Sequence, residues 1–252
     1  TGSNNTIVGY TAGDAITTAA GNTAVGHNAL TGNVSGADNT AVGYNSLPVN
    51  TVAGNTGIGA NALNVNTTGA GNTALGRNSL VANTTGGTNT GLGNYAGMAN
   101  TTGANNTFVG STAGDANTTA SQNVAVGSAA LSANTTADNN TAVGFNALGA
   151  NTTAQDNTAL GYEAMDACTT GSYNTAVGYQ ALDEISTGTR NTAVGYRCLA
   201  GPGDGSHNTA MGQACMESQT TGEKNACFGQ YAGQSITTGN YNNGVGANAL
   251  TL

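Results

Sequence analysis

Two of the four cysteines in this sequence are spaced so that their thiols could react with each other. Cys198 and Cys215 occupy the same position in adjacent copies of a 17-residue repeat that runs along the chain. If successive copies stack like neighbouring strands, their Cα atoms lie about 4.8 Å apart, close to the range that a disulfide permits. An extracellular setting would allow that bond. The alternative is that both cysteines replace alanine as small apolar fillers. Cys168 and Cys227 occupy other positions of the repeat, without an evident partner.

Four aromatic residues, Phe145, Tyr162, Tyr179 and Tyr196, follow one another at the same 17-residue step. Stacked copies would bring their rings into one ladder. Such a ladder could serve as a glycan-binding platform, because sugars dock on aromatic faces. It could equally be lateral packing within a chain or between chains. The sequence leaves both interpretations open.

Acidic residues are few, and one pair is equivalent in neighbouring copies. Asp166 and Asp183 are separated by one copy of the repeat, with Glu163 and Glu184 nearby. Paired carboxylates can hydrolyse glycosides, but a solvated edge or a weak cation site is the interpretation that the pattern favours. The sequence has no Ser-His-Asp arrangement, no phosphate-binding loop and no Cys/His spacing typical of zinc. We therefore predict no enzyme, no cofactor and no metal site.

A recurring Asn-Thr-Thr segment offers two further kinds of chemistry. Its first threonine could form a regular hydroxyl array of the kind that binds ice. The members of this array are Thr67, Thr84, Thr101, Thr118, Thr135, Thr152 and Thr169. The same segment reads as a glycosylation sequon, although turn chemistry alone also explains it. The sequon asparagines are Asn66, Asn83, Asn100, Asn117, Asn134 and Asn151.

The composition limits the classes of partner. The chain has 252 residues, of which 40 are glycine and 6% are charged, and its formal net charge is −8. Nucleic-acid binders need Lys and Arg to displace counterions, so this charge argues against them, and it equally disfavours docking to anionic lipid. No apolar run approaches the roughly 18 residues that span a bilayer. There is no initiator Met and no secretory signal, so we expect a mature or excised segment.

The element that must position these side chains is the repeat itself. Its consensus is N-T-A-V-G-Y-N-A-L-x-x-N-T-T-G-x-x, and the only step that departs from this length runs from Asn39 to Asn55 and is shorter by one. The first asparagine of each copy is Asn5, Asn22, Asn39, Asn55, Asn72, Asn89, Asn106, Asn123, Asn140, Asn157, Asn174, Asn191, Asn208, Asn225 and Asn242. T-A-V-G-Y is typical of a short strand, N-T-T-G of a second extended piece, and Asn and Gly of sharp bends. We predict an all-β parallel β-solenoid, or β-roll, of fifteen coils forming one repeat domain, 1–252, uncapped at both ends.

Equivalent positions in successive coils predict the core. The residue before the invariant glycine (Val8, Val25) and the leucine after it (Leu30, Leu47) should form two interior ladders. Four copies replace this leucine by glycine: Gly13, Gly97, Gly114 and Gly233. Small residues on both sides of the short strand imply close approach from each face, one from the interior and one from a second chain. The first asparagines should hydrogen-bond along the stack.

The N-T-A-V-G-Y-x-A-L and N-T-T-G elements resemble the repeat region of phage and prophage tail-fibre proteins, over residues 5–250. A looser similarity is to the head of YadA-like trimeric autotransporter adhesins, whose box between Asn and Gly is one residue longer. These resemblances imply a surface or virion fibre, assembled as a trimeric bundle.

Together these observations favour an extracellular, cell-surface or virion fibre or adhesin segment, a homotrimer that gains glycan affinity through multivalency. The first alternative is a self-assembling extracellular filament, formed by subunits that stack end to end. The second alternative is an ice-binding solenoid.

Overall fold

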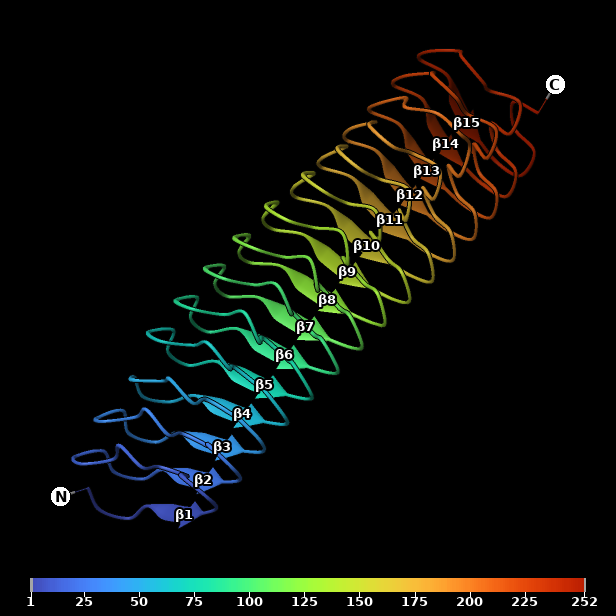
Figure 1. Cartoon of the computed structure of the whole chain (residues 1–252). Helices are drawn as coiled ribbons and strands as arrows, with labels where there is room; N and C mark the ends of the chain where they lie inside the picture. Colours follow the sequence, from blue (N-terminus) through green and yellow to red (C-terminus); the bar gives the residue numbers. More distant parts are fainter. Residues whose placement is uncertain (1, 252) are drawn as a thin grey trace. The chain divides into compact units, whose positions relative to one another are not determined.

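The computed structural model describes residues 2–251, and these residues form strands and turns without any helix. The chain divides into two compact units, Thr1–Asn123 and Val124–Leu252 (Figure 1). The first unit contains β1 (Thr6–Val8), β2 (Thr23–Val25), β3 (Thr40–Val42), β4 (Thr56–Ile58), β5 (Thr73–Leu75), β6 (Thr90–Leu92) and β7 (Thr107–Val109). The second contains β8 (Val124–Val126), β9 (Thr141–Val143), β10 (Thr158–Leu160), β11 (Thr175–Val177), β12 (Thr192–Val194), β13 (Thr209–Met211), β14 (Ala226–Phe228) and β15 (Asn243–Val245).

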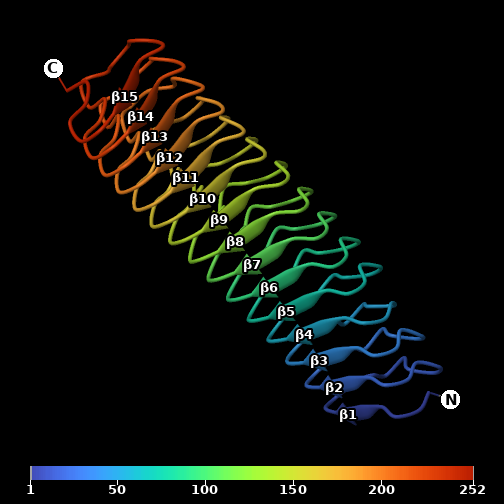
Figure 2. The ribbon, with the colours of Figure 1, turned by 180° about the vertical axis from the view of Figure 1, so that it is seen from behind.

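Within each unit the strands pair in parallel and in chain order (Figures 1 and 2). Thr23 pairs with Thr40 in the first unit, and Thr158 pairs with Thr175 in the second. The one shortened step keeps the register, because Thr40 pairs with Thr56. Equivalent residues of successive copies are therefore neighbours in space, and the predicted parallel β-solenoid is confirmed. The N-T-T-G segment makes no strand, but its backbone bonds to the next coil, as in the 2.9 Å bond from Thr67 N to Thr84 O.

The leucines that follow the glycine line the interior, as predicted, and we call them the leucine column. Its completely buried members include Leu30, Leu47, Leu63, Leu80, Leu131, Leu148 and Leu182. These residues adopt the left-handed backbone conformation, with φ of 54° at Leu30 and 48° at Leu80. That conformation costs a non-glycine residue about 1–2 kcal/mol, and burial of the side chain, worth about 1.5–3 kcal/mol, offsets it.

The second predicted interior ladder was wrong. In each strand the middle residue, not the last, faces the interior: Ala24 and Ala41 are completely buried, whereas Leu75 and Leu160 are 44% and 47% exposed. The reason is the thinness of the coil. Ser46 Oγ donates to the carbonyl of Gly57, the middle residue of the next coil's strand, at 2.7 Å. The inner strand position therefore admits only small side chains, and the large aliphatic residue turns outward.

Phe108 is the largest side chain at the inner position, and the leucine column makes room for it. A Cβ on either Gly97 or Gly114 would clash with the Phe108 ring. Both glycines stand where other coils carry leucine, so the benzyl group fills the space that the missing side chains leave. In these copies the volume that glycine gives up in the leucine column is taken by a larger residue at the inner strand position.

The glycine after each strand is fixed by two constraints. Gly43 has φ of 129°, a region that other residues rarely adopt. A Cβ on Gly43 would also lie 2.7 Å from the carbonyl oxygen of Gly59 in the next coil. Any side chain here would push two coils apart. This explains why the position never varies within the chain.

Candidate functional site: ladders on and inside the coils

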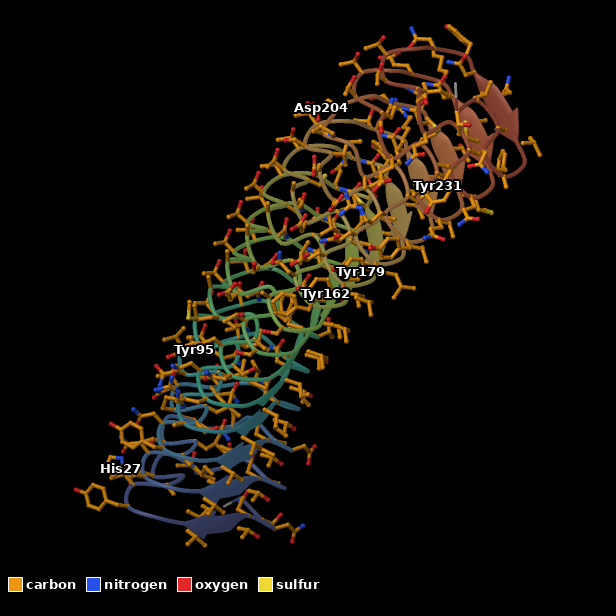
Figure 3. All side chains as sticks on the ribbon, turned by 90° about the vertical axis from the view of Figure 1, so that its right-hand side faces the viewer. His27, Tyr95, Tyr162, Tyr179, Asp204 and Tyr231 are labelled. Carbon is orange, nitrogen blue, oxygen red and sulfur yellow. The ribbon has the colours of Figure 1, made fainter. Side chains whose placement is uncertain are left out.

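The predicted aromatic ladder forms on the surface of the second unit. The rings of Phe145, Tyr162, Tyr179 and Tyr196 stack at centroid distances of 5.2–5.3 Å with interplanar angles of 6–16°. Tyr162 and Tyr179 project side by side from neighbouring coils (Figure 3). Each ring covers the face of the next, so the ladder offers mainly ring edges to solvent. Sugars dock on ring faces, and the geometry therefore favours the lateral-packing interpretation.

The residues that follow three of these rings make a polar chain beside the aromatic ladder. Gln180 Nε2 donates to Glu163 Oε2 at 2.8 Å, and Arg197 Nη1 donates to Gln180 Oε1 at 3.2 Å. Arg197 Nε also forms an ion pair with Glu217 Oε1 at 2.7 Å. The hydrogen bond to Glu163 raises the pKa of Tyr162, and the one to Glu217 raises the pKa of Arg197. These contacts link charged and polar side chains of four successive coils.

A second aromatic stack lies in the first unit and was not predicted. The ring of His27 stacks between those of Tyr10 and Tyr44, at 5.4 Å from each. Figure 3 shows His27 on the surface of the first coils. The signal was present in the sequence, because these three residues share one position of the repeat. Within the described residues the histidine belongs to no cluster of acids, thiols or imidazoles that could hold a metal, and it acts as a ring in a stack.

The paired acids, Asp166 and Asp183, both have raised pKa values. Asp183 is buried, and its Oδ1 has no hydrogen-bond partner. Burial raises the pKa of Asp183 to about 6, against the lowering effect of Arg197. Burial also raises the pKa of Asp166. No group of three or more His, Cys, Asp or Glu side chains within residues 2–251 could hold a metal ion.

The first asparagines form a buried ladder, as predicted, although the bonds run from backbone to side chain. Asn72 N donates to Asn55 Oδ1 at 2.8 Å, and Asn89 N to Asn72 Oδ1 at 2.8 Å. Most of the side-chain amides also reach across the coil, as Asn72 Nδ2 does to Gly86 O at 2.8 Å. The bond across the shortened step, from Asn55 N to Asn39 Oδ1, is equally short at 2.8 Å. The hydrogen bonds of this ladder therefore stabilise the turn that precedes each strand.

The sequon asparagines form a second ladder inside the coils, and we call it the amide ladder. In the first unit Asn66 Nδ2 donates to Asn50 Oδ1, Asn83 to Asn66, Asn100 to Asn83 and Asn117 to Asn100, at 2.7–2.9 Å. All of these side chains are completely buried. An enzyme cannot attach a glycan to them in the folded chain. The turn-chemistry interpretation of the sequon is the one that fits.

The threonines beside the amide ladder use their hydroxyl hydrogens within the stack. Thr67 Oγ1 donates to Thr84 O at 3.1 Å, and Thr101 Oγ1 to Thr118 O at 3.0 Å. In the second unit Thr152 Oγ1 donates to Thr169 O at 3.2 Å. These hydroxyls therefore have no donor left for ice. Only their acceptor lone pairs remain for solvent.

The outward face of the strands carries two ladders with no charged residue in either. The first residue of each strand is threonine in twelve of the fifteen coils, and Val124, Ala226 and Asn243 stand in the other three. The third residues are Val8, Val25, Val42, Ile58, Leu75, Leu92 and Val109 in the first unit. In the second they are Val126, Val143, Leu160, Val177, Val194, Met211, Phe228 and Val245. We call the outward first and third residues together the strand face. Sequence reasoning had placed the aliphatic ladder inside, and so had missed it as a surface.

The cysteines are all buried free thiols. Cys198 and Cys215 lie in adjacent coils as predicted, and their thiols interact, which raises the pKa of Cys215 to about 12. Cys227, for which the sequence suggested no partner, also lies against Cys215: Cys215 Sγ is 3.2 Å from Cys227 O. Burial raises the pKa of Cys168 to about 11. All four side chains are completely buried, so none of these thiols is exposed enough to act as a nucleophile in the folded chain.

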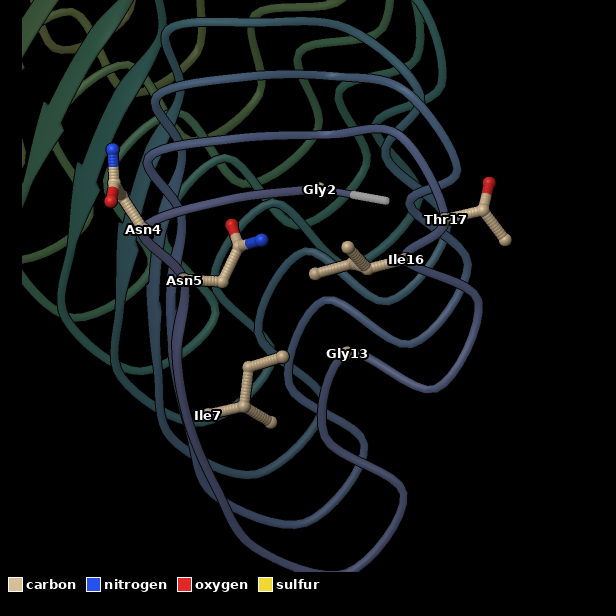
Figure 4. Close-up of a pocket in the computed structure, with 7 residues that line it drawn as sticks. All are labelled: Gly2, Asn4, Asn5, Ile7, Gly13, Ile16 and Thr17. Atoms are coloured by element: carbon tan, nitrogen blue, oxygen red, sulfur yellow. The ribbon is translucent and has the colours of Figure 1, made fainter.

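One hollow lies in the first coil and carries no reactive group. It is lined by Gly2, Asn4, Asn5, Ile7, Gly13, Ile16 and Thr17 (Figure 4). Ile7 and Ile16 project into the space beside Gly13, which stands where other coils carry leucine. The hollow is the interior of a coil seen from its end. Its lining residues include no carboxylate, imidazole or thiol.

Comparison with known proteins gives no relative: no family model, no curated protein and no solved structure matches the chain. Residues 2–251 contain no helix that could cross a membrane.

Proposed function

We propose that this chain is a structural fibre segment, outside the cell or on a virion, whose copies associate side by side through the strand face. One observation carries the proposal. The strand face presents an uninterrupted apolar ladder in each unit, with Leu75, Leu92, Leu160 and Met211 each more than 40% exposed. A monomer in water gains nothing from such a ladder, and contiguous exposed apolar surface is typical of an interaction site.

A second copy is the occupant that the repeat favours. Strands in register place equivalent side chains at one fixed spacing, about 4.8 Å. Another copy has the same spacing, so one matched contact sets every other contact along the face. The chain's net charge of −8 opposes self-association, but both columns of the strand face are uncharged. The resemblance to trimeric fibres supports three copies around this face.

The test uses a charge placed on the strand face. Leu160→Lys is expected to convert the oligomer to a monomer, because three or more ammonium groups would meet in one interface. Thr153→Lys is the matched control, since Thr153 is exposed in the N-T-T segment, off the face. Light scattering during gel filtration measures the mass, and circular dichroism checks the fold. A wild-type chain that stays monomeric at high concentration would refute the proposal.

Electron microscopy of the same sample distinguishes this proposal from the filament. Side-by-side association gives rods of one length, whereas end-to-end stacking gives continuous filaments. If Leu160→Lys still forms filaments, the copies associate through the coil ends and not through the strand face.

Ice binding is a second candidate because of the threonines on the strand face, not those of the N-T-T segment. Thr73 and Thr158, at the first strand position, are exposed, and their neighbours repeat in register. Thermal hysteresis that is abolished by Thr158→Lys but not by Thr153→Lys would support this candidate. Wild-type protein without hysteresis at millimolar concentration would eliminate it.

A further inference from the structure

The strongest unassigned chemistry in the molecule is a cluster of three thiols, those of Cys198, Cys215 and Cys227, inside the second unit. Each residue just before a member of the leucine column is small, and we call these residues the small column. They face the middle strand residue of the next coil. Members of the small column include Ala29, Ser46, Ser79, Cys198 and Cys215. Ser46 contacts Gly57 in this way, and Ser79 contacts Gly91 through a 2.9 Å hydrogen bond to its carbonyl. Cys215 and Cys227 are the same kind of pair, with Cys215 Sγ 3.2 Å from the Cys227 carbonyl oxygen.

The distance across this pair is the one that a disulfide needs. In a disulfide each sulfur lies roughly 3 Å from the partner's Cβ, given the S–S bond of about 2.05 Å. A Cβ placed on Gly57 would lie 2.7 Å from Ser46 Oγ. The coils therefore bring a γ atom of the small column to bonding range of the next strand's Cβ. Cys198 and Cys215 lie one above the other in parallel coils, and their Cα spacing of about 4.8 Å is also one that a disulfide permits. The choice between the two pairs therefore rests on side-chain volume.

Side-chain volume points to the same pair. Where the small column carries serine, the facing strand residue is glycine, as in Ser46 with Gly57 and Ser79 with Gly91. Cys198 faces Ala210, which has no γ atom. Cys215 and Cys227 are two γ-bearing residues at a place that elsewhere holds one. A covalent S–S bond is about 2.05 Å long and brings the two sulfurs well inside their contact distance, so it removes the crowding.

Gly233 supplies the freedom that bond formation requires. A Cβ on Gly233 would lie 2.6 Å from Cys227 Sγ. The Cys227 side chain therefore rests in the space that the absent leucine leaves, and it can rotate from there toward Cys215.

We propose that Cys215 and Cys227 form a disulfide that locks the coil of β13 to the coil of β14, with Cys198 as the remaining thiol of the cluster. The reaction needs a two-electron oxidant, and a small-molecule disulfide such as oxidised glutathione supplies it. One cysteine sulfur displaces a thiol from the oxidant, and the second cysteine sulfur displaces the other thiol. Two protons leave the cysteines, one S–S bond forms, and the oxidant ends as two thiols.

The environment sets when this happens. The hydrogen bond with Cys198 raises the pKa of Cys215, and that with Cys215 raises the pKa of Cys227. Thiols that stay protonated and buried react slowly once the coils have closed. Oxidation therefore belongs to folding, and the finished bond is protected from reductants by the same burial.

Trypsin gives a direct test, because the full chain has only four cleavage residues, Arg77, Arg190, Arg197 and Lys224. Cys198 and Cys215 fall in one peptide, 198–224, and Cys227 falls in the next, 225–252. The protein is refolded in a glutathione buffer, alkylated in denaturant and digested without reduction. The expected result is two alkylated thiols, at Cys168 and Cys198, and a species joining peptides 198–224 and 225–252. Reduction should separate that species.

Two variants complete the test. Cys198→Ala should still give the joined species, and Cys227→Ala should lose it and keep all three of its thiols free. A bond within peptide 198–224 that survives in Cys227→Ala would show instead that Cys198 pairs with Cys215, and it would overturn the proposal. Four alkylated thiols in the wild-type chain would overturn it as well. The bond is tested by mass and not by stability, so a variant that folds less well still reports the pairing.

Discussion

The two units share one backbone plan but fill the interior differently. In the first unit the amide ladder runs without a break from Asn50 to Asn117. In the second it includes the bond from Asn151 to Asn134 at 3.2 Å, and the next coil carries Cys168 in place of asparagine. The following coils place Ile185, Pro202 and Gln219 there.

The difference shows what a buried polar ladder demands. An asparagine inside the stack donates to the coil before it and accepts from the coil after it, so a single replacement leaves a group unpaired. Asn151 Oδ1 is buried and has no hydrogen-bond partner, in the coil just before Cys168. An apolar side chain such as Ile185 needs no hydrogen-bond partner in the neighbouring coils and has only to fill the available volume. The ladder is therefore uniform from Asn50 to Asn117, and the second unit is free to vary once its ladder has ended.

The largest effect should come from the glycine column, and it should be equal in both units. Gly43→Ala would set a Cβ 2.7 Å from Gly59 O, and Gly212→Ala one 2.5 Å from Gly229 O. We expect each to lower the unfolding free energy by about 3–5 kcal/mol, from overpacking together with backbone strain. Urea unfolding measures it.

Gly54→Ala is the matched control for Gly43→Ala. Gly54 also has a positive φ, 75°, but a Cβ there would meet nothing within 4 Å. It should cost only about 1 kcal/mol, which is the strain alone. Equal losses in the two variants would show that contact between coils does not fix the glycine.

Asn83→Ala should break the first unit's ladder. Asn83 Nδ2 donates to Asn66 Oδ1 and to Gly86 O, at 2.8 and 2.9 Å. Its removal leaves the buried Asn66 Oδ1 without this donor and takes the Asn83 Oδ1 acceptor from Asn100 Nδ2. We therefore expect a loss of about 3 kcal/mol. Hydrogen exchange should locate faster opening in the coils around Asn83. Thr85→Ala, at an exposed neighbour, is the control and should change stability by less than about 0.5 kcal/mol. If protection from hydrogen exchange is unchanged in Asn83→Ala, the ladder is not a stabilising element.

Asp183 should make the second unit's stability depend on pH. Its pKa is raised to about 6 from the ordinary 3.8, mainly by burial, with Glu184 and Asp166 adding to the rise and Arg197 opposing it. The folded chain thus prefers the protonated acid. Stability should be highest below pH 4 and should fall as the pH rises to about 6, by no more than about 2 kcal/mol, since solvent partly screens the charge.

Asp183→Asn should remove this dependence and stabilise the second unit at pH 7. The measurement is the urea midpoint at pH 4, 5, 6 and 7. Glu184→Gln makes the same charge change at an exposed neighbour. It should keep most of the slope, because burial and not Glu184 is the main cause of the raised Asp183 pKa. A slope that is the same in Asp183→Asn and the wild type would assign the pH dependence to other groups.

The smallest predicted effect is a gain in stability from restoring an asparagine to the amide ladder. Cys168→Asn would supply a donor to Asn151 Oδ1 and could keep the contact that Cys168 Sγ makes with Gly171 O at 3.3 Å. We expect a gain of about 1 kcal/mol in unfolding free energy. Ile185→Asn is the control, because the coil before it has no asparagine to pair with, and it should destabilise. A loss of stability in Cys168→Asn would show that the ladder cannot be extended.

The repeat made most of the fold predictable, and its short strands made one feature unpredictable. The period determined which residues are neighbours, so the parallel register, the buried Leu30 and the stacked Tyr179 followed from spacing alone. A three-residue strand does not say which face is inside. Val25 was placed in the core because it is larger than Ala24, but the coil is too thin for it.

Contacts across the coil were also missed, because they join different positions of the repeat in successive coils, whereas the spacing argument compares only equivalent positions. The contact of Cys215 with Cys227 is one of them. A signal existed: serine in the small column, at Ser46 and Ser79, coincides with glycine in the next strand, at Gly57 and Gly91. The outward direction of the aliphatic ladder could not be predicted, because it depends on how thin the coil is in cross-section, and only the structure shows that.

The exchange of volume around Phe108 bears on how such a chain can lengthen during evolution. Near-identical copies invite unequal crossing-over, which adds or deletes whole coils. Phe108 depends on Gly97 before it and Gly114 after it, so a recombination point that separates them leaves either a clash or a void. Gene expansion in this region must duplicate Phe108 and both glycines as one block.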